Sequence, residues 1–341
     1  MRRIVSAAMA LLLCVSMAYA GDTKKSSDYS EQIDVNAART IARFGVITDL
    51  HHTNKADSKS RKYSAALQKA EYFVETMNRE KADFIVELGD FVDMLADGKD
   101  PMQNLNEIEG IYTSFRGPKY HVLGNHEFDN VERKVLINYL ENTGIPAGQT
   151  YYSFDHNGIH CIVLDADYTN AEPHRPFDMI KKGETAWWTW KDAWVPQAEL
   201  DWLAADLAAS DKPTVVFTHQ VVSRDKLGDS TEDHTIKNAA AVRKILEADG
   251  QVLAVFSGHD HRGEVAVRNG IHYFVLEGNV GISRDWPEIS PTDGMNAKAD
   301  CPFVLVEIKE DDKGALRIYQ MNLKGNAQQY SYVDEVQKVV K

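Results

Sequence analysis

The chain has 341 residues and a formal net charge of −13, and 43% of its residues are hydrophobic. A field this acidic does not suit sequence-independent binding to DNA or to anionic lipid, so we expect neither a nucleic-acid nor a membrane partner. The ordinary apolar fraction supplies a sizeable core, and the length suits one large α/β domain or two small ones. A small anionic substrate is still compatible with this charge if metal ions supply local positive charge.

The first 20 residues have the pattern of a secretory signal peptide. Arg2 and Arg3 form a basic start, an apolar run covers 4–17, and Ala18-Tyr19-Ala20 is a small-x-small cleavage site. The run is too short, and wrongly flanked, for a membrane anchor. We therefore expect cleavage after Ala20 and a periplasmic or secreted protein. The chain then divides into a signal peptide (1–20), a flexible leader (21–40), a folded domain (41–325) and a C-terminal tail (326–341).

Two cysteines remain after the expected cleavage, because Cys14 leaves with the signal peptide. Cys161 and Cys301 both lie in or beside apolar, strand-like runs, which favours two buried thiols. An oxidising compartment also permits a disulfide between them. Neither cysteine belongs to a metal-ligand pattern.

From residue 43 onward, strand-like and helix-like runs alternate. In the first half, apolar runs predict buried strands at 43–48, 84–88 and 119–123. Helices are expected between and after them, over 60–81, 102–115 and 130–142. This βαβαβα order implies parallel strands.

The second half has hairpins as well as helices. The turns His156-Asn157-Gly158 and Asn269-Gly270 predict hairpins, and 167–196 is rich in loops. Helices are expected at 197–209 and 235–248. Two sheets packed face to face, with helices outside, account for the strands expected at 151–155, 159–166, 213–218, 253–256, 264–268, 271–276, 303–308 and 315–321.

Five short segments supply metal-ligand side chains, and each follows a run that reads as a buried strand. They are Asp49-Leu50-His51, Gly89-Asp90-Phe91-Val92-Asp93, Gly124-Asn125-His126-Glu127, Thr218-His219 and Gly258-His259-Asp260-His261. Ligands of open α/β sheets gather just beyond the carboxyl ends of the strands. Singly each motif is weak, but all five in one order make coincidence improbable. Together they offer enough donors for two divalent metals, which a hydrolase uses to attack phosphorus at neutral pH.

This set of motifs resembles the calcineurin-like metallophosphoesterase superfamily. The resemblance covers most of the chain and identifies 41–325 as a metallophosphoesterase domain. It implies an α/β fold, a four-layer αββα sandwich of two mixed β-sheets flanked by helices. It also implies two metal sites: Asp49, His51 and His261 bind the first ion, Asn125, His219 and His259 bind the second, and Asp90 bridges both.

The chemistry of the donors supports that division. Two cations about 3.5–4 Å apart repel each other, and a bridging carboxylate offsets the repulsion. A bridging hydroxide is the expected nucleophile, attacking phosphorus in line with the leaving group. Nitrogen and oxygen ligands without a thiolate suit manganese, iron, zinc or nickel. Manganese is preferred, because the layout resembles a manganese-dependent subgroup of this superfamily.

Three further residues are candidates for catalysis. The resemblance implies that His126 contacts the phosphate or protonates the leaving oxygen. Glu127 holds His126 as imidazolium or fixes its tautomer, or else it caps the following helix. Asp93 is expected to orient the imidazole of a metal ligand.

The branch of the superfamily follows from single positions. Serine/threonine phosphatases carry Arg where this chain has Met94, which disfavours that branch. The layout is most similar to manganese-dependent ADP-ribose/CDP-alcohol diphosphatases and their bacterial relatives, although that subgroup commonly has Gln where His51 stands. We therefore expect an exported phosphoesterase acting on small phosphodiesters or nucleotide diphosphates, with no evident protein partner. An alkaline phosphomonoesterase is the alternative, and a metal-binding interaction protein without turnover is the non-enzymatic one.

A tryptophan-rich stretch over 185–202 is expected to wall the site or to pack in the core. Helical spacing with Leu200 assigns Trp202 to the core. The other tryptophans could stack on a nucleobase, and they are Trp187, Trp188, Trp190 and Trp194.

Overall fold

The computed structural model describes residues 39–58, 60–96, 100–224, 232–280, 301–310, 315–322 and 338–339. The expected signal peptide lies outside the described residues, as do most of the leader and of the C-terminal tail. Strand β1 already begins at Arg39, whereas the sequence placed the start of the domain at residue 41. Within the described ranges, no helix is both long and apolar enough to cross a bilayer.

The first sheet combines the strands of the N-terminal half with strands from the end of the chain. Its order is β12-β11-β10-β1-β2-β3. Strands β1, β2 and β3 are parallel, with β3 at the edge, and β10 pairs antiparallel with β1. The strands cover Arg39–Ile47 (β1), Phe84–Glu87 (β2), Lys119–His121 (β3), Val304–Glu310 (β10), Ala315–Asn322 (β11) and Lys338–Val339 (β12).

The second sheet holds the expected hairpins at its two edges. Its order is β4-β5-β6-β7-β9-β8, with parallel pairing from β5 to β9 and antiparallel pairing in β4–β5 and β8–β9. The strands cover Tyr152–His156 (β4), Ile159–Val163 (β5), Thr214–Phe217 (β6), Val252–Ser257 (β7), Arg262–Arg268 (β8) and Ile271–Glu277 (β9). Both sheets are therefore mixed, as the sequence predicted.

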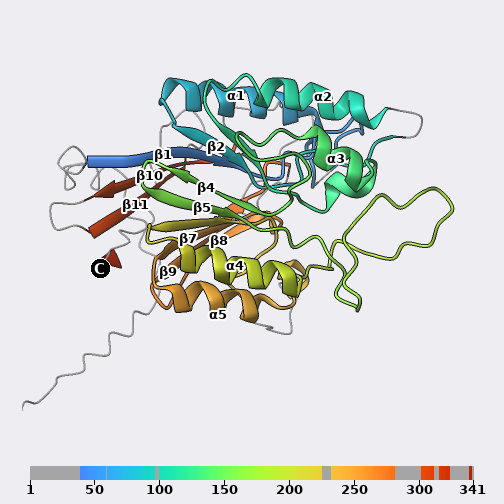
Figure 1. Ribbon diagram of the computed structural model, residues 1–341. Coiled ribbons are helices and arrows are strands. Elements are labelled where there is room, and N and C mark those ends of the chain that lie inside the picture. The colour runs from blue at the N-terminus through green and yellow to red at the C-terminus, as the bar shows by residue number, and fades with distance from the viewer. Residues whose placement is uncertain are drawn as a thin grey trace, which may run out of the picture. The chain divides into compact units, whose positions relative to one another are not determined.

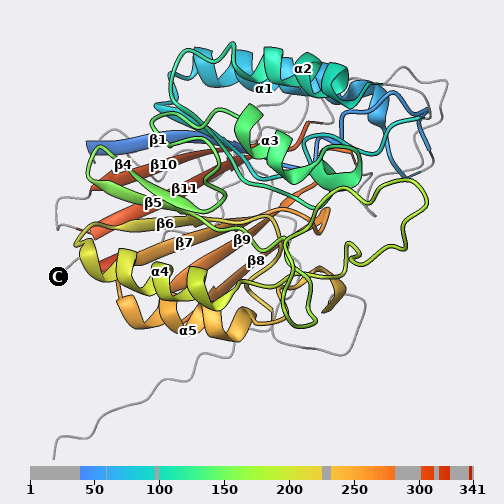
Figure 2. The same ribbon diagram turned by 45° about the vertical axis from the view of Figure 1, so that its right-hand side comes forward.

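Helices cover the outer face of each sheet. Helices α1 (Ala66–Arg79) and α2 (Pro101–Tyr112) lie over the first sheet, and α4 (Gln197–Ala209) and α5 (Ala239–Asp249) lie over the second (Figures 1 and 2). A shorter helix, α3, covers Arg133–Tyr139. The four-layer αββα arrangement is thus confirmed. The α5 helix begins later than the 235–248 pattern predicted, because Thr235 and Ile236 pair with the Val221 segment instead.

Alternation along the strands assigns side chains to the layers. In β1, Phe44 and Val46 lie in the core between the sheets, whereas Ile47 faces the helices. Gly45 also faces the helices, and a Cβ atom there would lie 2.2 Å from the sulfur of Met77 on α1. Glycine at this position therefore allows α1 to pack closely on the sheet.

The two cysteines lie in different apolar clusters. Cys161 belongs to the core between the sheets, and Cys301 packs in the cluster under α1 and α2. Both are buried free thiols, which confirms that interpretation over the disulfide. Burial raises the pKa of Cys161 well above its usual range, so this thiol stays protonated and inert.

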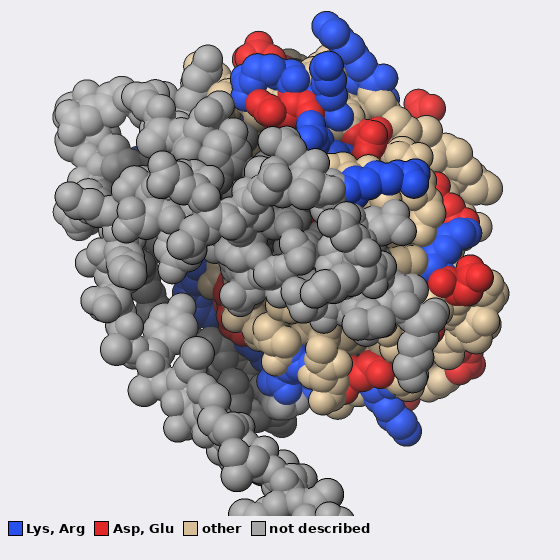
Figure 3. Space-filling model, turned by 90° about the vertical axis from the view of Figure 1, so that its left-hand side faces the viewer, with Lys and Arg blue, Asp and Glu red and all other residues tan. Residues whose placement is uncertain are grey.

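Charged side chains of both signs decorate the surface. On the face that Figure 3 shows, the basic and acidic side chains of the described residues lie interspersed.

Candidate metal centre

The expected metal ligands meet where the central strands of both sheets end. Asp49 and His51 follow β1, and His219 follows β6 in the other sheet. Among the described residues, three groups of possible donors form there. Two of them share one carboxylate, that of Asp90, and the third is His51, Asp93 and His126. The first group is Asp49, His51, Asp90 and His261, and the second is Asp90, His219 and His259. Asn125 lines a cavity together with Asp90, His259 and His261.

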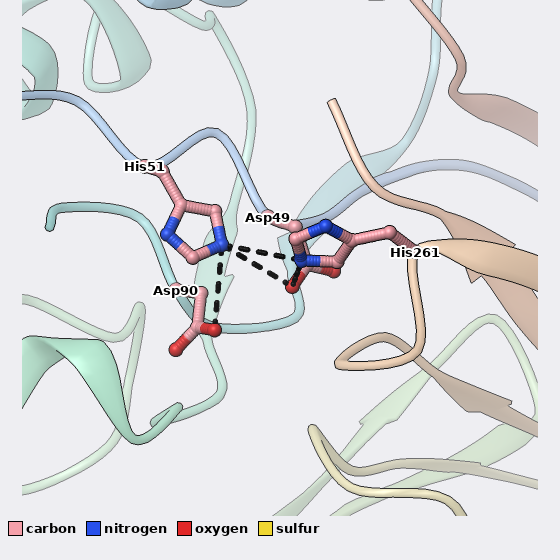
Figure 4. Close-up of side chains that lie close together, drawn as sticks. All are labelled: Asp49, His51, Asp90 and His261. Carbon is pink, nitrogen blue, oxygen red and sulfur yellow. Dashed lines mark hydrogen bonds and ion pairs between the residues drawn. The ribbon is translucent and has the colours of Figure 1, made fainter. Parts of the chain in front are cut away.

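The first group surrounds a single point (Figure 4). The Nε2 atom of His261 lies 3.1 Å from Oδ1 of Asp49 and 3.3 Å from Nε2 of His51. The Nε2 atom of His51 also lies 3.5 Å from Oδ2 of Asp90. All four ligand atoms lie within 4.8 Å of one another.

The second group lies on the other side of Asp90. The Nε2 atom of His219 is 3.3 Å from Oδ2 of Asp90 and 3.1 Å from Nδ1 of His259. The side-chain oxygen of Asn125 is buried and accepts no hydrogen bond from the described residues. A buried oxygen of this kind is costly unless a ligand satisfies it.

Hydrogen bonds on the far edge of two imidazoles fix their tautomers. The Nδ1 atom of His219 lies 2.8 Å from the carbonyl oxygen of Leu88, which can only accept, so Nδ1 carries the proton. In the same way, Nδ1 of His51 donates to the carboxylate of Asp93 at 3.0 Å. In the neutral form of each ring, the Nε2 atom that faces Asp90 then carries a lone pair. Lone pairs and carboxylate oxygens this close repel one another, and a divalent cation between them would bind them all as ligands.

The carboxylates of the centre remain ionised at neutral pH. Burial raises the pKa of Asp90, but nearby His219, His126 and His51 outweigh burial and hold it well below its usual range. For Asp49, burial is likewise outweighed, chiefly by His261, and its pKa is also well below the usual range. Anionic oxygens are the form that a hard cation binds.

Several ligands adopt backbone conformations that L-residues rarely use. The φ angles are 54° for Asp49, 49° for His51, 55° for Asp90 and 65° for His259. The left-handed region costs energy for a residue with a Cβ atom, and such residues cluster at functional sites. The sharp turns at the strand ends aim these side chains at the shared centre.

Glu127 has a different role from either that the sequence suggested. Its carboxylate accepts hydrogen bonds from the backbone N–H groups of Gly124 at 2.7 Å, Asp90 at 3.0 Å and Phe91 at 2.5 Å. It therefore neither pairs with His126 nor caps the following helix. A tertiary contact decides this role, because the loop after β2 brings the N–H groups of Asp90 and Phe91 to this buried carboxylate. Glu127 thus positions the loop that carries Asp90.

Asp129 pairs with His126, and the sequence analysis missed it. The Nδ1 atom of His126 lies 2.6 Å from Oδ2 of Asp129, and its ring lies 4.7 Å from that of His51. Burial lowers the pKa of His126, but Asp90 and Asp129 outweigh burial and raise it to about 9. The available signal was an acid three residues after the histidine.

Asp93 lies at the junction of several basic groups. Besides His51, it binds Nη1 of Arg61 at 2.9 Å and Nζ of Lys55 at 3.3 Å. Burial raises the pKa of Asp93, but His51, His126 and Arg61 outweigh burial and hold it far below its usual range. The sequence named Asp93 but gave no sign of Lys55 or Arg61.

Two adjoining cavities open at the centre. One, of about 450 Å³, is lined by ligands of both groups, and the other, of about 570 Å³, extends away from them. Both have the size of small-molecule sites. The residues common to the two linings are Arg61, Asn125, His126 and Trp190.

The tryptophans divide between cavity wall and packing. Trp188 and Trp190 line the larger cavity. Trp187 packs under Arg175, and Trp194 stacks on His174 at 4.2 Å. Trp202 packs against the core cluster beneath α4, as its spacing predicted.

Comparison with known proteins agrees with this geometry. The model of the calcineurin-like phosphoesterase family matches residues 42–263. A manganese-dependent ADP-ribose/CDP-alcohol diphosphatase of Arabidopsis thaliana is 24% identical over 71% of this chain and 87% of its own length. Its counterpart in Bos taurus is 22% identical over 76% and 90%.

A solved structure shares the fold. The dimetal phosphatase from Danio rerio superposes with a TM-score of 0.64 at 18% identity, over 89% of this chain and 100% of that chain. With the family model matching well over half of the sequence, the chain belongs to the calcineurin-like phosphoesterase family and is a metal-dependent hydrolase of phosphoester bonds.

Proposed function

We propose that the protein is an exported hydrolase that uses two divalent ions to cleave small phosphodiesters or nucleotide diphosphates. The observation that carries this proposal is the pair of buried donor groups that share Asp90. A carboxylate common to two groups is what a pair of closely spaced cations requires. Because the family assignment makes the chain a hydrolase, a metal-binding interaction protein without turnover does not fit.

The donors divide between two ions. Bound ions would supply an activated water and would neutralise charge on the phosphoryl group. Manganese is the preferred metal, because the relatives in Arabidopsis thaliana and Bos taurus are named manganese-dependent and the donors are nitrogen and oxygen. Asp49, His51 and His261 would hold the first ion, Asn125, His219 and His259 the second, and Asp90 both.

His126 is the proposed proton donor. Asp129 binds its Nδ1 atom, so Nε2 is left to contact a phosphoryl oxygen or to protonate the leaving oxygen. Its side chain is 20% exposed in the wall of both cavities, where a substrate can reach it.

Three substrates test the reaction class. The purified protein, supplied with manganese, should hydrolyse bis-p-nitrophenyl phosphate and ADP-ribose with a higher kcat/KM than p-nitrophenyl phosphate. A clear preference for p-nitrophenyl phosphate would replace the proposal with an alkaline phosphomonoesterase.

Export has its own test. Protein expressed from the full sequence should be found outside the cytoplasm, and N-terminal sequencing should give Gly21 as its first residue. Cytoplasmic protein that keeps residues 1–20 would contradict the proposed export.

A further inference from the structure

Two basic side chains share one carboxylate at the junction of the two cavities. Arg61 binds Oδ2 of Asp93 and Lys55 binds Oδ1, and these side chains are 31% and 32% exposed. Asp93 itself is only 3% exposed and also accepts from His51. Counting these ion pairs alone, two fixed positive charges face one negative charge, and both cations reach solvent in the larger cavity.

Charged side chains of both signs line the smaller cavity as well. There Asp260 binds Arg262, and behind them it also binds Arg224. In a chain whose net charge is −13, the ion pairs of Asp93 join two cations to one carboxylate. An anion bound within the cleft is therefore favoured beside Lys55 and Arg61.

This excess charge lies next to the metal centre. The Nη1 atom of Arg61 is 3.2 Å from Nδ1 of His51, and Nε2 on the other edge of that imidazole faces Asp90. One imidazole ring therefore separates the guanidinium from the proposed ligand atom. A substrate group attached directly to a phosphoryl at the centre would reach Arg61.

The larger cavity also has aromatic and apolar side chains in its wall. Trp190 and Met94 are 41% and 47% exposed, although both are large apolar side chains. Both line the larger cavity, together with Tyr63 and Trp188. Exposed apolar side chains that gather in one cavity indicate a ligand with a ring or another apolar group.

We propose that Lys55 and Arg61 bind the departing phosphate of a diphosphate substrate, with its organic group against Trp190 and Met94. This inference rests on the proposed function. Water oxygen forms a bond to the attacked phosphorus, and the anhydride P–O bond breaks. Its electron pair stays on the departing phosphate, which leaves as a phosphomonoester. The growing negative charge lies beside Lys55 and Arg61, which stabilise it. Such a site would favour substrates that carry a second phosphate over monoesters.

The Lys55→Gln variant tests the site with two substrates. It should lower kcat/KM for ADP-ribose about tenfold, as loss of a charged contact to phosphate does at a partly exposed site. The loss on bis-p-nitrophenyl phosphate, whose leaving group carries no phosphate, should be at least fivefold smaller. Lys212→Gln is the matched control, because Lys212 pairs with Asp155, is 38% exposed and lines neither cavity, so it should change neither rate.

Binding gives a second readout. Calorimetry with the methylene-bridged analogue of ADP, which is not hydrolysed, should show about tenfold weaker binding to Lys55→Gln. Arg61→Lys keeps the positive charge but removes the paired N–H donors of the guanidinium. It should weaken binding of the analogue more than binding of inorganic phosphate.

The outcomes separate this inference from the function beneath it. If wild-type protein hydrolyses neither ADP-ribose nor bis-p-nitrophenyl phosphate, the proposed function fails. If it hydrolyses bis-p-nitrophenyl phosphate and not ADP-ribose, this inference fails and the proposed function stands. If it hydrolyses both, yet Lys55→Gln loses both substrates equally and binds the analogue like wild type, the Lys55–Arg61 site is wrong and the proposed function stands.

Discussion

The two halves of the metal centre hold their histidines by different means. In the half around Asp49, His51 and His261, the imidazole of His51 donates to the carboxylate of Asp93, which also binds Lys55 and Arg61 at the cavity. In the half around His219 and His259, His219 donates to the backbone carbonyl of the buried Leu88. One ligand is thus connected to groups that a substrate can reach, and the other is fixed by the fold alone. Asp90 joins the two halves.

Removing the shared carboxylate should have the largest effect. Asp90→Asn keeps the size of the side chain but removes the anion that offsets repulsion between two cations. We expect activity to be abolished and both ions to be lost, as measured by elemental analysis after dialysis. A variant that keeps two ions and wild-type turnover would show that the halves do not depend on Asp90.

His126 lines both cavities, and the proposed mechanism assigns it to the substrate rather than to a metal ion. His126→Ala should keep both ions and reduce kcat by about a hundredfold or more, as loss of an acid or a phosphate contact does. The same metal analysis provides the control. Loss of the ions from this variant would show that His126 supports the centre structurally.

Asp93→Asn should weaken metal binding in one half of the centre and not in the other. The substitution weakens the hydrogen bond that orients His51, so affinity for the ion of the first group should fall roughly ten- to a hundredfold. The ion of the second group should remain, because Leu88 and not Asp93 holds His219. Metal titration followed by calorimetry would show one weakened and one unchanged step. Two equally weakened steps would contradict the division into halves.

The smallest effect concerns stability in the first sheet. His121 lies 3.4 Å from Glu87 and 3.4 Å from Glu109. Burial lowers its pKa, but Glu109 and Glu87 outweigh burial and raise it to about 10. Because the folded pKa exceeds the unfolded value near 6.5, this stabilisation is full below about pH 6.5 and is lost as pH rises toward 10.

Denaturation curves at several pH values test this dependence. The difference in free energy of unfolding between wild type and His121→Gln should shrink with rising pH, by at most about 1.4 kcal/mol per pH unit. A difference that is constant from pH 6 to pH 10 would contradict the charged state of His121.

Local patterns predicted the fold and the side chains that meet at the centre. The apolar run 84–88 predicted a strand and the pattern of 197–209 predicted a helix, and the structure has β2 at Phe84–Glu87 and α4 at Gln197–Ala209. The seven expected ligands converge because each lies at most four residues after the end of a parallel strand, and parallel strands end at the same edge of a sheet.

The partners of those ligands could not be predicted in the same way. Lys55 lies outside the expected elements, and Arg61 lies in the first turn of the helix expected over 60–81. Only the folded chain brings them to Asp93. Glu127 follows the histidine directly, yet its carboxylate lies against the backbone of the Asp90 loop, so sequence adjacency was misleading. Away from the centre, the pairing of Arg133 with the buried Asp165 could not be predicted either, because neither residue belongs to a motif.

The most direct test of the central claim is to count and locate the ions in active protein. Crystals of manganese-loaded, catalytically competent protein should show two anomalous peaks at the manganese edge, one on each side of the Asp90 carboxylate. A single peak, or none, in protein that retains full turnover would contradict a mechanism in which two cations share Asp90.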